Sequence, residues 1–205
     1  MVPRVKGPIL LEPPFNQPLF ARALRTALLG RTPRSLTLPS ALSPHAAQRL
    51  RNLARPHCKR FDLADRGCYT FTDLYHAELH ALARPLLDEL QRFAQEVSGA
   101  ALGAGGARIV WLGRGDYALR LDDARLRPHQ EFLEATLDLS PSPHPFAGIV
   151  YSEGASIHLP IAQLPGQISL VWRGPASTRC DRYRNRFVGA HACILLRAAF
   201  PLAES

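Results

Sequence analysis

The stretch from Phe132 to Leu139, FLEATLDL, decides the fold class, because apolar and polar residues alternate along it with a period of two. Such alternation is typical of a β-strand whose two faces meet different surroundings. One face is expected to pack on a core and carries Leu133, Ala135, Leu137 and Leu139. The other face is expected to meet solvent or a cavity and carries Glu134, Thr136 and Asp138.

The same period continues on both sides of this stretch. Clusters of Gly, Pro and Ser separate the apolar segments, as turns between short strands require. The strand candidates cover residues 108–112, 116–121, 132–139, 148–151, 155–159, 167–172, 179–184 and 191–200. Eight short strands in about ninety residues predict a β-sandwich or a barrel.

The chain before residue 108 is expected to be mainly helical. Apolar residues at helical spacing predict helices over 16–29, from Ser43 onward, and over 73–97. Pro44 suits the first position of the second helix, whereas Pro85 should bend or divide the third. Helices followed by strands, in place of alternating βαβ units, exclude a Rossmann-like fold and predict an α+β protein.

The 205 residues are expected to form a single domain, in which 1–107 are mainly helical support and 108–205 form the β core. The composition, 46% hydrophobic and 20% charged, is that of a globular protein. No apolar run approaches the roughly 20 residues of a membrane span. No signal peptide is recognisable at the N-terminus, so a cytoplasmic protein is expected.

The formal charge of +8 comes mainly from arginines, which are spread along the chain in singles and pairs. This distribution does not favour a nucleic-acid partner, which would require a basic stripe or interleaved aromatic residues. The four cysteines show no C-x-x-C spacing and are expected to be free thiols.

Local sequence from Gly115 onward resembles a known family. The segment GDYALRLD, from Gly115 to Asp122, resembles the motif G-[DN]-[YF]-x-x-H-x-D of the iron(II)/2-oxoglutarate dioxygenases, in their prolyl-hydroxylase-like branch. The segments that resemble later strands of that family are 135–141, 146–151, 164–174 and 184–200. The resemblance implies a double-stranded β-helix, or jelly roll, with supporting N-terminal helices. It also implies Fe(II) and 2-oxoglutarate as cofactors, and a small molecule or a protein side chain as substrate.

The metal-binding motif of this chain departs from the family pattern. Asp122 is retained, but Arg120 stands at the first histidine position, and a guanidinium cannot donate a lone pair to iron. No histidine follows near the second metal position until His191. Counted from the last predicted strand, His191 alternatively stands at the position of the family's carboxylate-binding arginine. The resemblance also implies that Tyr117 and Arg197 bind 2-oxoglutarate.

Two interpretations therefore stay open. In the first, the chain is a hydroxylase-like oxygenase with a rearranged metal site, since ferrous iron needs two imidazoles and one carboxylate. Its ligands would be Asp122 and two of the histidines His129, His158 and His191. In the second, the chain is a metal-free, catalytically inactive jelly roll that binds an acidic ligand. The arginines of that pocket would be Arg120, Arg182 and Arg186. The oligomeric state is not predicted.

Overall fold

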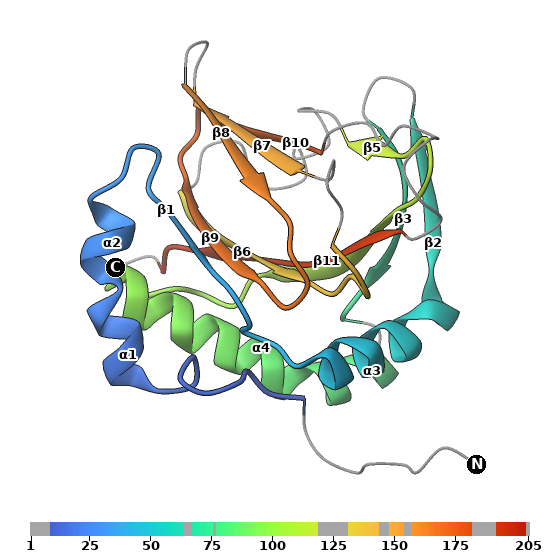
Figure 1. Ribbon diagram of the computed structural model, residues 1–205, viewed down its shortest axis with the longest axis horizontal. Coiled ribbons are helices and arrows are strands. Elements are labelled where there is room, and N and C mark those ends of the chain that lie inside the picture. The colour runs from blue at the N-terminus through green and yellow to red at the C-terminus, as the bar shows by residue number, and fades with distance from the viewer. Residues whose placement is uncertain are drawn as a thin grey trace.

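The computed structural model describes residues 9–63, 67–75, 77–118, 131–143, 148–153, 157–181 and 192–203. Two layers of antiparallel strands face each other, and helices cover the outer side of one layer (Figure 1). The large layer runs in the order β1 (Ser35–Leu38), β9 (Ile168–Arg173), β6 (Phe132–Asp138), β11 (Cys193–Pro201) and β4 (Gly106–Leu112). The small layer runs in the order β5 (Tyr117–Ala118), β10 (Ser177–Asp181), β7 (Gly148–Glu153) and β8 (Ile157–Ala162).

Two further strands join the layers at one side. Strand β3 (Gly67–Asp73) pairs with β4 and also with β5, and β2 (Lys59–Leu63) pairs with β3. From β4 to β11 the chain crosses repeatedly between the layers, which is the topology of a jelly roll. The predicted double-stranded β-helix is confirmed, and the strand pairs formed by the described residues are all antiparallel.

The helices are α1 (Pro18–Ala23), α2 (Arg25–Leu29), α3 (Pro44–Ala54) and α4 (Ala77–Ser98), with a 3₁₀ turn, η1, over Arg55–His57. The Ser43 hydroxyl caps α3 by accepting a hydrogen bond from the Ala46 N–H, and Pro44 takes the first helical position as predicted. In the part of the chain that the structure describes, no helix is long and apolar enough to span a membrane.

Two helix predictions need correction. The helix predicted over 16–29 is divided at Leu24, whose N–H bonds to the Ala21 carbonyl three residues back and tightens the turn. The helix predicted from Asp73 begins only at Ala77, because Asp73 ends β3. Pro85 lies inside α4 without dividing it.

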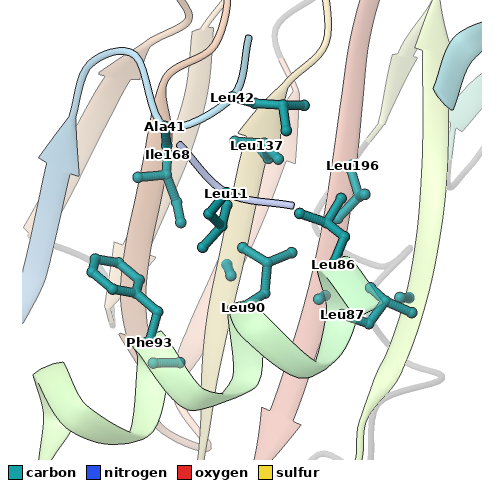
Figure 2. Close-up of a cluster of buried hydrophobic side chains, with 14 of the residues drawn as sticks. Leu11, Ala41, Leu42, Leu86, Leu87, Leu90, Phe93, Leu137, Ile168 and Leu196 are labelled. Carbon is teal, nitrogen blue, oxygen red and sulfur yellow. The ribbon is translucent and has the colours of Figure 1, made fainter. Parts of the chain in front are cut away.

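Two clusters of apolar side chains stabilise these layers. The first lies between the helices and the large layer, where Leu86, Leu90 and Phe93 of α4 point toward the strands (Figure 2). Leu137 of β6 and Leu196 of β11 face them from the sheet. The second cluster lies between the two layers and contains Val110, Leu112, Ile149, Tyr151, Ile161 and Leu195. We call the space between the layers the barrel interior.

Strand β6 separates these two environments. Its apolar face, predicted from the alternation, packs in the cluster beneath the helices. Its polar face turns into the barrel interior, so that Glu134, Thr136 and Asp138 are all buried. The sequence predicted that this face meets either solvent or a cavity, and the structure shows that it is enclosed.

Candidate functional site

The carboxylate of Glu134 lies in the barrel interior, and this residue is 1% exposed. Its Oε2 atom accepts a hydrogen bond from Nη1 of Arg173 at 2.6 Å, and its Oε1 atom accepts one from Nη1 of Arg179 at 2.6 Å. The Tyr151 hydroxyl donates a third bond to Oε1 at 2.9 Å. Charge-assisted bonds of this length are among the strongest that a protein makes.

The strands bring these groups together from both layers. Arg173 ends β9, which pairs with β6 in the large layer, and its guanidinium also lies over the rings of Phe132 and Tyr151. Arg179 and Tyr151 are register partners on β10 and β7 of the small layer. Glu134 therefore connects the two layers through hydrogen bonds.

A second buried ion pair lies beside the first. Arg197 of β11 and Asp181 of β10 make a bidentate pair, with Nη1 at 2.9 Å from Oδ2 and Nη2 bonded to Oδ1. The charge of Arg197 also acts on Glu134, so that the two pairs form one electrostatic unit. We call Glu134, Tyr151, Arg173, Arg179, Asp181 and Arg197 the interior ion cluster.

The protonation states in this cluster follow from burial and charge together. Burial alone would raise the pKa of Glu134, but the charges of Arg179, Arg173 and Arg197 outweigh it and hold the pKa well below its ordinary range. Burial, and then the Glu134 charge, raise the pKa of Tyr151, so its hydroxyl stays protonated and can donate. The carboxylate is thus ionised, and three guanidinium groups face two carboxylates inside the barrel.

The described part of this interior does not fit an iron ion held by two imidazoles and a carboxylate. The side chains of β10 that take part in the interior ion cluster are Arg179 and Asp181, and this strand contains no histidine. A guanidinium has no lone pair for a metal. Within the described ranges, no three His, Cys, Asp or Glu side chains converge on a common point.

The predicted site residues fall into two groups. Those outside the described residues are Arg120, Asp122, His129, Arg182, Arg186 and His191. Tyr117 is half-buried on β5, opposite Cys68 of β3. Arg197 lies in the barrel interior, where both of its Nη atoms bond to Asp181. His158 is exposed on β8 and bonds through Nδ1 to the Ser152 hydroxyl at 2.9 Å.

The sequence did not predict that Glu134, Arg173 and Arg179 meet. The period of two placed Glu134 on the face away from the core, which was the available signal. Arg173 directly follows the predicted strand 167–172, and Arg179 is the first residue of the next predicted strand, 179–184. Their convergence on one carboxylate depends on strand register, which the alternation of single strands does not specify.

Comparisons with known proteins agree at the level of the fold. No protein-family model matches the sequence, and none of the curated proteins matches it. A 2OG-Fe(II) oxygenase family oxidoreductase from Burkholderia pseudomallei has a similar structure, with a TM-score of 0.69 and 16% identity. That match covers 88% of this chain and 90% of the other.

Two prolyl hydroxylases are similar as well. A prolyl-4-hydroxylase from Pseudomonas putida matches with a TM-score of 0.67 and 11% identity, over 90% of this chain and 100% of the other. A prolyl hydroxylase from Trichoplax adhaerens, in complex with a hypoxia-inducible-factor peptide fragment, matches with a TM-score of 0.60 and 11% identity, over 91% of each chain. The chain therefore has the double-stranded β-helix fold of the 2-oxoglutarate/iron(II) oxygenases.

Proposed function

We propose that this chain acts as a 2-oxoglutarate/iron(II) oxygenase with a rearranged metal site, hydroxylating a small molecule or a protein side chain. The observation that carries the proposal is the arrangement of strands β4 to β11 in two layers, which the oxygenases share over nearly the whole of both chains. A peptide bound to the Trichoplax enzyme supports a protein side chain as one class of substrate.

The proposed metal ligands are Asp122, His129 and His191. Asp122 and His129 lie in the segment that follows β5, and His191 lies in the segment that follows β10. The last described residues before these segments, Ala118 and Asp181, are register partners in the small layer. Because both segments leave from one point of the sheet, their side chains can belong to one site.

The proposed 2-oxoglutarate-binding residues lie beside the same point. Tyr117 precedes Ala118 on β5, and Arg197 contacts Asp181. A guanidinium is suited to hold a carboxylate of the co-substrate in a bidentate manner. For Arg197 to do so, that carboxylate must displace or share Asp181, which occupies both Nη atoms.

The test is anaerobic reconstitution of the purified protein with Fe(II), followed by metal analysis and by measurement of succinate formed from 2-oxoglutarate in air. We expect about one iron per chain and succinate release, and loss of both in Asp122→Ala. Asp62→Ala, which changes an exposed carboxylate on β2, is the matched control and should retain both. A protein that binds no iron and forms no succinate contradicts the proposal.

One observation favours a second function, the metal-free binding of an acidic ligand. In the interior ion cluster, three guanidinium groups outnumber the two carboxylates among the described residues. An anion that enters the barrel would be attracted by these guanidinium groups. In this case metal-free protein binds 2-oxoglutarate in titration calorimetry, and Arg120→Ala weakens binding at least about tenfold. Unchanged binding in that variant contradicts this second function.

A further inference from the structure

An open cleft of about 840 Å³ lies outside the barrel, beside α3. Its floor includes Trp111 of β4 and Ile194 of β11, which belong to the helix-covered face of the large layer. Their neighbours Val110 and Leu195 turn to the barrel interior instead. The cleft is therefore separate from the interior ion cluster, and its walls share no residue with it.

Arginines dominate the walls of this cleft. They are Arg51 of α3, Arg55 of η1, Arg60 of β2 and Arg114 in the turn after β4. One acidic residue, Asp116, also lines it. Among these lining residues the formal charges leave an excess of three positive charges, which lowers the energy of an anion in the cleft.

The single acid neutralises only one of these arginines. Arg60 makes a bidentate pair with Asp116, through Nη2 to Oδ1 at 2.8 Å and Nη1 to Oδ2 at 3.2 Å. Asp116 is held in place because its Oδ2 also accepts the Gly113 N–H at 2.8 Å. The Arg60 guanidinium is thus oriented toward the cleft by a buried carboxylate.

The other arginines retain capacity for a ligand. Arg55 and Arg114 are exposed, and neither makes an ion pair or a side-chain hydrogen bond with any described residue. Arg51 is half-buried, donates from Nη1 to the Leu139 carbonyl, and also interacts electrostatically with the carboxyl group of Asp138. Two exposed guanidinium groups without a carboxylate partner among the described residues, those of Arg55 and Arg114, therefore line the cleft together with Arg51.

We infer that this cleft binds a small molecule that carries a diphosphate group. A guanidinium fork matches two phosphate oxygens, and a diphosphate carries about the three negative charges that the cleft lacks. The volume lies within the roughly 300–1,000 Å³ of ligand sites, and Trp111 and Ile194 offer apolar surface for an organic portion. This site goes beyond the proposed oxygenase activity and needs neither iron nor 2-oxoglutarate.

The test is isothermal titration of the metal-free full chain with pyrophosphate, inorganic phosphate and adenosine diphosphate at low salt. We expect pyrophosphate to bind at least about tenfold more tightly than phosphate, because two phosphoryl groups span several arginines. Tighter binding of adenosine diphosphate than of pyrophosphate identifies a nucleotide as the source of the group, and equal binding identifies the diphosphate alone.

The double variant Arg55→Ser/Arg114→Ser should lose at least about tenfold in pyrophosphate affinity. Both side chains are exposed, so thermal unfolding of the variant should match the wild type. The control Arg31→Ser/Arg92→Ser removes the same charge from exposed positions outside the cleft and should keep the affinity. The inference is overturned by absent pyrophosphate binding, by equal losses in both double variants, or by binding of a single-stranded oligonucleotide in the absence of pyrophosphate binding.

Discussion

Glu134 shows how a charged residue can occupy the interior of a β-barrel. Removing an ion from water is costly, but two guanidinium groups and a tyrosine hydroxyl replace the lost water around this carboxylate. The arrangement is sensitive to the loss of one partner, because the remaining charges stay buried. The charge of Glu134 therefore matters more to this fold than its volume.

Replacing Glu134 by Gln should lower the free energy of unfolding by about 3–5 kcal/mol, because Arg173 and Arg179 then lose their common counter-charge in the interior. Urea unfolding followed by tryptophan fluorescence measures the change. Glu96→Gln is the matched control, since Glu96 pairs with Arg22 at the surface, where an ion pair contributes little. If the two variants are equally stable, the interior ion cluster does not hold the layers together.

The same residue predicts a pH dependence. The pKa of Glu134 is lower in the folded chain than in the unfolded chain, where it is about 4.3. Its contribution to stability is therefore complete above the unfolded pKa and is lost as the pH falls below it toward the folded pKa. Urea midpoints of wild type should fall more steeply than those of Glu134→Gln between about pH 5 and pH 3. Parallel curves would contradict this assignment.

Single residues were predicted unevenly from the sequence. The alternation in FLEATLDL placed Glu134 away from the core, and the family resemblance directed attention to Arg197, which does lie in the barrel interior. The partners Arg173 and Arg179 were not predicted, because nothing in a single strand specifies which residue lies across the barrel. Contacts between strands depend on register and on the distance between the layers.

At the scale of elements, α4 supports the large layer by packing one face on it. Leu90 is 0% exposed in this interface, whereas Leu82, on the same helix, is 39% exposed. Leu90→Ala should cost about 2–5 kcal/mol through the cavity that it leaves, and Leu82→Ala well under about 1 kcal/mol. Thermal unfolding of both variants checks the difference. Similar melting temperatures of the two variants would contradict the packing of this face of α4 on the large layer.

The turn before β9 makes a second prediction at this scale. Gly166 has φ of +76°, and a Cβ there would come within 2.7 Å of the Leu42 carbonyl oxygen. Gly115 has φ of +81°, with nothing within 4 Å of a built Cβ. Both alanine variants carry the strain of positive φ, but only Gly166→Ala also requires the Leu42 loop to move. Gly166→Ala should therefore melt at a clearly lower temperature than Gly115→Ala, and equal melting would contradict the close approach.

The elements were predicted best where the alternation of residues was strong. Strands β4 and β6 to β11 fell near their predicted places, whereas β1, β2 and β3 were not predicted. Strand β1 has four residues at the edge of the large layer, and β2 is mostly exposed, so neither shows a clear apolar face. These strands form through pairing with β9 and β3, which is a tertiary effect that local sequence does not show.

For the whole molecule, the two layers and the helical support reproduce the fold of the 2-oxoglutarate/iron(II) oxygenases. The sequence predicted that fold from the order of helices and strands together with short family-like segments. The described part of the barrel interior contains an ion pair in place of metal ligands, because Arg179 of β10 donates a hydrogen bond to Glu134. The proposed ligands must therefore come from the segments that follow Ala118 and Asp181.

The most direct test of this account is a crystal structure of the full chain prepared anaerobically with Fe(II) and 2-oxoglutarate. The proposed function predicts one iron, with imidazole nitrogens of His129 and His191 and a carboxylate oxygen of Asp122 all within about 2.0–2.2 Å of it. It also predicts that Arg197 contacts a carboxylate of 2-oxoglutarate. A metal-free barrel in which those side chains point apart, with the interior ion cluster unchanged, would contradict the claim that this chain is an iron oxygenase.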